Sequence, residues 1–240
     1  MIDLLTTATA KDERERDAKV ALLPIGSFEQ HGDYLPLITD TIVACAIANE
    51  IAKEHPVMVL APITISCSHE HASWRGTVSI SSQTLIRIVI DVADAVRRSG
   101  IDLLVLVNGH GGNYVLSNVV QEYTVTHGPV MSLYPRGADW SRARMDARME
   151  TNGHSDMHAG EFEASVLLDV APELVGRGVQ SADWLADDRP DLLTAGLSAY
   201  TRTGVIGRPS LGSASKGRAA LASLARHYRN PILRPPPLPE

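Results

Sequence analysis

The sequence predicts an α/β fold, a three-layer α/β/α sandwich around a mostly parallel central sheet. Its 240 residues are 44% hydrophobic and 21% charged, the balance of an ordinary globular protein. Apolar runs typical of buried strands alternate with segments of helical periodicity, and this alternation is typical of a parallel sheet with helices on both faces. The length fits one domain, which we predict to span 1–240.

Strands and helices alternate in order from residue 19. The run 19–26 is apolar up to Pro24 and ends at Gly26, as a buried strand followed by a turn does. Segment 39–54 has apolar residues at helical spacing, and Thr39 or Asp40 could cap it. The same two patterns predict the elements that follow, which are strands over 57–65, 102–107 and 129–134 and helices over 82–99 and 114–126.

The pattern changes beyond residue 135. Segment 136–160 is polar, with clustered Arg, Asp, Met and His, and we interpret it as an insertion or lid beside the functional site. Helices are predicted over 161–169 and 213–229, and the intervening segment 172–200 is predicted to be irregular. The tail 230–240 is proline-rich, and we interpret it as loosely ordered rather than as a ligand for another protein.

Composition excludes several classes of protein. A net charge of -6 does not suit a nucleic-acid binder. No run approaches the roughly 20 apolar residues of a membrane span, and the first residues lack the apolar core of a signal peptide, so we expect a cytoplasmic protein. Cys45 and Cys67 lie in apolar segments, which indicates buried thiols rather than a zinc site.

The first group of candidate site residues is Glu29, His31 and Asp40. Residues two apart on an extended chain project to the same side, so Glu29 and His31 can face one point. Asp40 lies at the start of a predicted helix, where the helix dipole favours a carboxylate. Asp40 alone could be a cap and Glu29 a surface charge, but the three together between a buried strand and a buried helix predict metal ligands.

The second group is the turn Asn108-Gly-His110-Gly-Gly-Asn113, directly after a predicted strand. Glycines let a ligand approach the backbone closely, and His110 would be a good neutral-imidazole ligand. Gly111, Gly112 and Asn113 are predicted to contact the substrate. The turn matches neither a P-loop nor G-x-G-x-x-G, so phosphate binding is not favoured.

The third group is His158, Glu161 and Glu163. The two glutamates cannot share a helix face, so only one points easily into the site, and we expect this to be Glu163. His158 precedes the helix and could serve as a metal ligand or a proton carrier. Segment 68–71, Ser-His-Glu-His, resembles a metal clip, so His71 could line the site with Trp74 as a wall. A capped turn with one satisfied histidine is an equal alternative.

Two carboxylates and two or three imidazoles suit Zn²⁺, Mn²⁺ or Fe²⁺. Asp40, by its position, could bridge two ions, and metal-activated water could then attack a carbonyl. There is no G-x-S-x-G elbow of a serine hydrolase, and the HEH at 69–71 is not H-E-x-x-H. The residues therefore predict a metal-dependent hydrolase.

Several motifs resemble those of the creatininase family of metal-dependent amidohydrolases, in the same order and with similar spacing, from about residue 20 to about residue 220. They are LLPIGSFEQHGDYLPLITDT, HEHASWRGTVSI, VNGHGGN, HAGEFEASVLL and GVIGRPSLGSASKG. The resemblance implies an α/β/α sandwich, a two-metal centre and a compact homo-oligomer, with a hexamer favoured. At the matching positions, Glu29 and His110 would hold one metal, His31 the other, and Asp40 would bridge them.

This sequence departs from creatininase itself at Gly112, where a glutamate binds metal in that enzyme. Glu163 matches the glutamate of the family's E-T-S motif, although Ala164 replaces the threonine, and it is the natural substitute for the second metal. His158 matches the family histidine that gives a proton to the leaving nitrogen. The NGHGGN turn is closer to other branches of the family, which include the mycofactocin precursor peptidase and an archaeal formamide hydrolase.

The sequence thus predicts hydrolysis of a C–N bond in a linear or cyclic amide, small or peptide-like, with two divalent ions (Zn, Mn or Fe) per subunit. His158 or Glu163 would protonate the leaving nitrogen. One alternative is a hydrolase that opens a lactone or a cyclic keto-sugar at the same centre. A second is a non-catalytic metal-binding protein, which Gly112 supports best.

Overall fold

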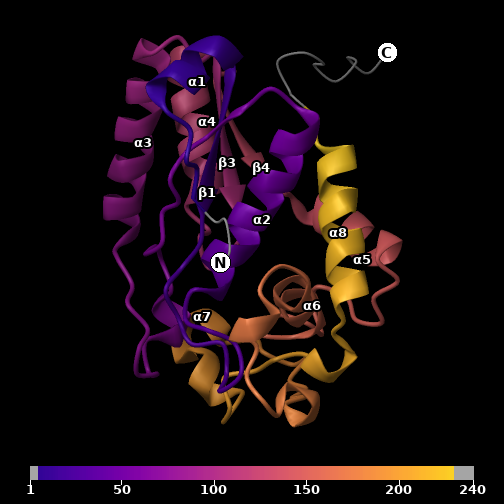
Figure 1. Ribbon diagram of the computed structural model, residues 1–240. Coiled ribbons are helices and arrows are strands. Elements are labelled where there is room, and N and C mark those ends of the chain that lie inside the picture. The colour runs from indigo at the N-terminus through magenta and orange to yellow at the C-terminus, as the bar shows by residue number, and fades with distance from the viewer. Residues whose placement is uncertain (1–4, 230–240) are drawn as a thin grey trace, which may run out of the picture.

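The computed structural model describes residues 5–229, and their core is a parallel sheet between two layers of helices. The strands lie in the order β2-β1-β3-β4. In Figure 1, α3 and α4 cover one face of the sheet, and α2 and α8 cover the other. The predicted α/β/α sandwich is therefore confirmed.

The elements have the following bounds. The strands are β1 (Val20–Ile25), β2 (Met58–Val59), β3 (Leu103–Asn108) and β4 (Met131–Tyr134). The helices are α1 (Ala10–Arg16), α2 (Thr39–Glu54), α3 (Ser82–Arg98), α4 (Leu116–His127), α5 (Gly137–Asp146), α6 (Glu161–Val170), α7 (Leu192–Ala195) and α8 (Ala214–His227). Short 3₁₀ turns, including His69–His71, lie in the connections after β2, α6 and α7.

The two central strands are buried on both faces. Along β3, Leu103 and Val105 pack into the cluster formed with α2, α5, α6 and α8. Leu104 and Leu106 point the other way, into the cluster formed with α3 and α4. Because side chains alternate across a strand and both faces are covered, β1 and β3 are apolar along nearly their whole length rather than alternating with polar residues.

The segment predicted as a buried strand over 57–65 is a half-buried edge with only two residues in regular pairing. Its hydrogen bonds to β1 resume at Leu60 and Ile63, with Ala61 and Pro62 left out. Pro62 has no N–H to donate, and proline is tolerated in sheets mainly at edges.

Three helices were not predicted, and one of them is the four-residue α7, which lies in the segment 172–200 predicted to be irregular. Helix α1 has no buried residue and is formed by a capping box between Thr9 and Asp12, a local signal without apolar periodicity. Helix α5 lies inside the polar segment 136–160 and buries Ala143 against α8. No helix within residues 5–229 is long and apolar enough to cross a membrane. The proline-rich tail 230–240 lies outside the described residues.

The N-terminus of α2 is pressed against the ends of β1 and β3. A Cβ atom on Gly26 would lie 2.3 Å from Thr41 N, and one on Gly109 would lie 2.3 Å from Asp40 O. Glycine at both positions therefore allows this close approach. Neither Thr39 nor Asp40 caps the helix, because Ile38 occupies the cap position. The Asp40 carboxylate is left to face the ends of the two strands.

Candidate metal centre

The predicted ligands gather where β1 and β3 end. The chain leaves β1 through α2 to β2 on one side of it and returns through α3 to β3 on the other. Such a reversal opens a crevice at the carboxyl ends of neighbouring parallel strands, where α/β proteins bind ligands. The crevice receives side chains from four parts of the chain, namely the loop after β1, the start of α2, the turn after β3, and the start of α6 with the residues just before it. These side chains are Glu29, His31, Asp40, His110, His158 and Glu163.

The atoms of these side chains that could bind a metal ion form three overlapping groups. Within each group, all of these atoms lie within 4.8 Å of one another. The groups are Glu29, Asp40 and His110; His31, Asp40 and Glu163; and Glu29, His31 and His158. Asp40 is shared by the first two, one oxygen facing each histidine. Asp40 Oδ2 lies 3.1 Å from His110 Nδ1, and Asp40 Oδ1 lies 3.1 Å from His31 Nε2. This is the arrangement of two adjacent cation sites with Asp40 between them.

Backbone carbonyls decide which ring nitrogen of each histidine carries the hydrogen. A carbonyl only accepts, so the ring nitrogen beside it must donate. His31 donates from Nδ1 to Glu29 O, His110 from Nε2 to Cys67 O, and His158 from Nε2 to Gln30 O. In the neutral rings the opposite nitrogens are therefore acceptors, and each faces a carboxylate. Metal-binding histidines are commonly oriented in this way.

The residues fit a cation. Within residues 5–229, Glu29 Oε1 and Asp40 Oδ2 are buried and take part in no hydrogen bond. Both lie within 3.2 Å of His110 Nδ1, an acceptor in the neutral ring. Buried carboxylate oxygens facing imidazole lone pairs need protons or metal ions between them, because burial of unpaired charge is costly. Carboxylate and imidazole together suit Zn²⁺, Mn²⁺ or Fe²⁺.

The electrostatics of the cluster follow from the same crowding. Burial alone would lower the pKa of His31, but the carboxylates of Asp40, Glu163 and Glu29 outweigh it and raise the pKa to about 9. The pKa of Asp40 is depressed, because the attraction of His31 and His110 outweighs the effect of burial. Burial raises the pKa of Glu163 to about 7. The carboxylates of the cluster therefore hold protons on the neighbouring imidazoles, and a metal ion bound between them would displace these protons.

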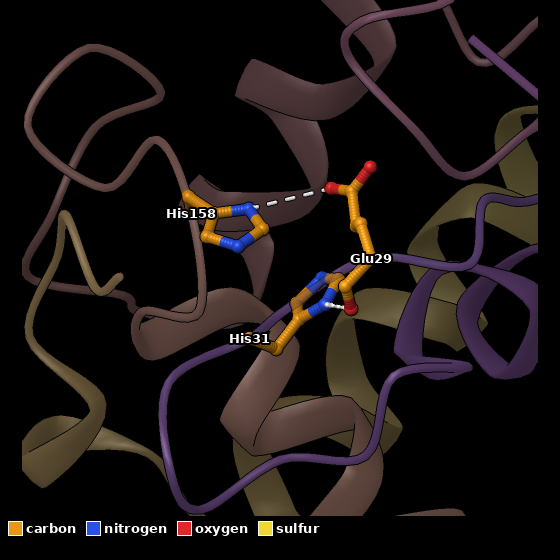
Figure 2. A group of neighbouring side chains, drawn as sticks. All are labelled: Glu29, His31 and His158. Atoms are coloured by element: carbon orange, nitrogen blue, oxygen red, sulfur yellow. Dashed lines mark hydrogen bonds and ion pairs between the residues drawn. The ribbon is translucent and has the colours of Figure 1, made fainter. Parts of the chain in front are cut away.

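His158 lies between two other imidazoles. Its ring centroid is 4.2 Å from that of His31 and 4.3 Å from that of His71. Burial, and then the neighbouring His31 and His71, hold the pKa of His158 well below its usual value. Figure 2 shows the His31 and His158 rings facing each other, with the Glu29 carboxylate directed at His158, 3.7 Å from Nδ1. His158 is thus neutral, and its free Nδ1 faces the cluster.

The two glutamates of α6 point in opposite directions, as the sequence predicted. Glu163 accepts a hydrogen bond from Ala159 N and lies 3.9 Å from His31 Nε2. Glu161 is fully buried on the other side, where it accepts hydrogen bonds from the backbone and hydroxyl of Thr151 and from Lys216. Glu161 therefore links the start of α6 to Thr151 and Lys216 and does not face the candidate metal ligands.

A cavity of about 480 Å³ opens beside His110 and Glu163. Gly111 lines it, and so do Trp140, Arg144, His154 and Met157 of the polar segment 136–160, together with Phe162 and others. The other predicted substrate residues lie elsewhere. His71 is buried against Glu29. The ring of Trp74 lies next to that of His71, and the centroids of the two rings are 6.5 Å apart.

Gly112 faces a smaller hollow on the other side of the turn. The Asn113 side chain binds Cys67 N and Asn108 Oδ1. Neither residue lines the 480 Å³ cavity.

Sequence reasoning missed two residues that arrange the site. Gln30 Oε1 accepts from Gly32 N, so its Nε2 donates to His71 Nδ1 and fixes the hydrogen of His71 on Nε2. Asp156 is buried and accepts from the N–H groups of Glu161 and Phe162 at the start of α6. Gln30 stands between two predicted ligands, which is a signal that could have found it, whereas Asp156 has no such signal.

Comparison with known proteins gives consistent matches. A family model described as "Creatininase: Creatinine amidohydrolase" matches residues 3–231. The mycofactocin precursor peptide peptidase of Mycobacterium ulcerans (strain Agy99) is 34% identical over 233 residues, which cover 91% of this chain and 86% of that protein. The 3-dehydro-scyllo-inosose hydrolase of Thermotoga maritima is 24% identical over 252 residues, covering 91% and 78%.

Solved structures show the same fold. The structure described as "Creatininase Mn" superposes with a TM-score of 0.77 at 21% identity, covering 92% of this chain and 93% of that one. At this identity the likeness concerns the fold alone.

Proposed function

Because the chain belongs to the creatininase family, as its motifs predicted, we propose that it is a metal-dependent amidohydrolase that cleaves a C–N bond in a linear or cyclic amide. One observation carries the proposal. Carboxylate oxygens and imidazole nitrogens form two adjacent groups that could each bind a metal ion, and Asp40 belongs to both groups. Glu29 and His110 would hold one divalent ion, His31 and Glu163 the other, and Asp40 would lie between them. The glutamate absent at position 112 is then replaced at the second site by Glu163.

When bound, two ions of Zn²⁺, Mn²⁺ or Fe²⁺ would polarise the substrate carbonyl and lower the pKa of a water molecule. The remaining chemistry belongs to the side chains. His158 has its Nε2 tied to Gln30 O, so it accepts a proton at Nδ1 and passes it to the leaving nitrogen. Glu163 is the other candidate for this transfer, because its raised pKa suits proton exchange near neutral pH.

The substrate is proposed to be a small amide or the end of a peptide. The cavity of about 480 Å³ is within the usual range for small-molecule sites. The Mycobacterium relative is described as a precursor peptide peptidase, which favours a peptide-like substrate. Segment 136–160 contributes much of the cavity wall, and we propose that this predicted lid selects the substrate.

The second candidate is hydrolysis of a cyclic keto-sugar or a lactone at the same centre, and the Thermotoga relative, a 3-dehydro-scyllo-inosose hydrolase, favours it. A panel of short peptides, creatinine, formamides, lactones and cyclic keto-sugars, assayed with added Mn²⁺ or Zn²⁺, separates the two. The non-catalytic alternative is not favoured, because the site keeps a full set of donors despite Gly112.

The decisive experiment combines elemental analysis with activity. The protein is stripped with a chelator, reloaded with Zn²⁺, Mn²⁺ or Fe²⁺, and assayed on the panel. We expect up to two ions per chain, with activity following the metal content. Full activity in protein that holds no metal would contradict the proposal.

We also propose a cytoplasmic homo-oligomer, with a hexamer favoured, on the strength of the family resemblance. Light scattering on the purified protein measures the subunit count directly, and a monomer at micromolar concentration would contradict this part of the proposal.

A further inference from the structure

The space beside Gly112 is filled by the side chain of Glu70. A Cβ atom on Gly112 would lie 2.1 Å from Glu70 Oε1 and 2.4 Å from His110 Nε2. The backbone of Gly112 does not have a positive φ, so its conformation alone does not require glycine. A Cβ on the neighbouring Gly111 would meet nothing within 4 Å. Two side chains, those of Glu70 and His110, therefore occupy the space that a Cβ at position 112 would need.

The Glu70 carboxylate lies on the far side of the His110 ring from Glu29 and Asp40. Its Oε1 is 3.6 Å from His110 Nε2, and the side chain is only 9% exposed. The same Nε2 donates to Cys67 O at 2.8 Å. A largely buried carboxylate is costly unless positive charge lies nearby. His110, polarised by a cation at Nδ1, would supply that charge through space, because its Nε2 hydrogen is donated to Cys67 O.

The turn that carries Glu70 also touches Glu29, the other ligand proposed for the same ion. His71 Nε2, which carries the hydrogen, lies 3.2 Å from Glu29 Oε1. Ser68 Oγ lies 2.8 Å from Ser27 Oγ, which in turn donates to Glu29 Oε2 at 2.6 Å. The short turn Ser68–His71 therefore contacts both Glu29 and His110, two of the ligands proposed for the same ion.

We propose that Glu70 is a positioning residue for the metal site of Glu29, Asp40 and His110, and that it can take this place only because residue 112 is glycine. The sequence alone suggests that the NGHGGN turn has lost a carboxylate. The structure places a carboxylate beside this turn from another segment. The inference rests on the proposed function, because it takes Glu29 and His110 as metal ligands.

The first test measures metal affinity in Glu70→Gln, which keeps the shape and removes the charge. Titration of the stripped protein with Co²⁺, followed by visible absorption and calorimetry, is expected to show one of two sites weakened about 10- to 100-fold. The melting temperature of the metal-free protein should stay within error of the parent. The matched control is Glu122→Gln, an exposed glutamate on α4, which should leave both sites unchanged.

Equal Co²⁺ affinities in Glu70→Gln, Glu122→Gln and the parent would overturn the inference while leaving the proposed function intact. If the parent protein binds no Co²⁺, Zn²⁺ or Mn²⁺ at all, the proposed function itself fails. The two failures are therefore distinguishable.

The second test is a double-mutant cycle on metal affinity. Gly112→Ala should weaken metal binding in the parent and weaken it less in the Glu70→Ala background, where half of the crowding is removed. Gly111→Ala, with open space around its Cβ, should leave the affinity unchanged. Equal losses from Gly112→Ala in both backgrounds would show that the two positions are independent and would overturn the inference.

Discussion

Three histidines of the centre owe their orientation to backbone carbonyls rather than to other side chains. Glu29 O, Cys67 O and Gln30 O each take one ring hydrogen, which leaves one free nitrogen per ring directed at the carboxylates. The tautomers are therefore set by the folded backbone before any ion arrives. Such preorganisation is typical of the histidines that bind metal ions in proteins.

Asp40→Asn tests the shared ligand. Because Asp40 faces both His31 and His110, its neutralisation should abolish binding of both ions and activity together. His31→Ala should likewise remove metal and activity. Elemental analysis and the amide panel measure both effects, and Asp91→Asn on the exposed face of α3 is the control. Two bound ions in active Asp40→Asn protein would refute the bridging role.

His158→Gln and Glu163→Gln should separate catalysis from metal binding. His158→Gln is expected to keep both ions and to lower kcat by about 100-fold or more, the usual contribution of a proton carrier. Glu163→Gln is expected to lose one ion as well as activity. The readouts are kcat, KM and metal content. If His158→Gln loses an ion, His158 is instead a ligand in the group with Glu29 and His31.

At the scale of elements, α6 is the piece that must be placed correctly, since it carries Glu163. Its first N–H groups are bound by Asp156, which also pairs with Arg144 of α5 at 2.7 Å. Gly160 is needed there, because a Cβ atom would lie 1.8 Å from Asp156 Oδ1. Asp156 thus ties α5, α6 and the loop between them into one wall of the cavity.

Asp156→Ala should destabilise the protein by about 3–5 kcal/mol, the usual result of removing one partner of a buried ion pair. It should also weaken metal binding, because the start of α6 loses its cap. Ser81→Ala is the comparison, since Ser81 caps α3 in the other helical layer. It should cost about 1 kcal/mol and leave metal affinity unchanged. Denaturant unfolding and metal titration measure both, and equal effects of the two substitutions on metal affinity would contradict this role.

For the whole molecule, the sheet order decides where chemistry can occur. Strands β1 and β3 are adjacent and parallel, and the chain reverses direction across the sheet between them. Helix α2 fits against their ends only because Gly26 and Gly109 have no side chains. The centre therefore joins the loop after β1, both helical layers and segment 136–160, and its ligands exist as a set only in the folded state.

Metal should for this reason stabilise the whole fold. An ion that binds only the native state adds about 2.7 kcal/mol when its free concentration is 100 times Kd. We expect the melting temperature to rise on adding Zn²⁺ or Mn²⁺ and to fall with a chelator, and expect no shift in Asp40→Asn. Differential scanning calorimetry measures this, and a metal-induced rise of equal size in Asp40→Asn would contradict it.

The sequence by itself determined the fold class and most of the residues that gather at the candidate metal centre. Apolar runs and helical periodicity are consequences of burial on both faces of a parallel sheet, so β1, β3, α2 and α3 could be predicted within a residue or two. Glu29, His31 and His110 could be found because each lies directly after an apolar strand. Residues two apart on a helix face different ways, so only one of Glu161 and Glu163 could face the site, and the match to the family's E-T-S motif favoured Glu163.

Only the tertiary structure decided how those residues meet. Contacts between Glu70 and His110, or between Asp156 and the start of α6, join segments with no periodic signal in the sequence. Edge position and Pro62 shortened β2, and local capping formed α1. Compared with creatininase, the sequence lacks a ligand at Gly112. In the folded protein, the absence of a side chain at Gly112 leaves the space that the Glu70 carboxylate occupies. Sequence spacing shows which residues are close along the chain. The chemistry of this centre depends on residues that are far apart in the sequence and meet only in the folded protein.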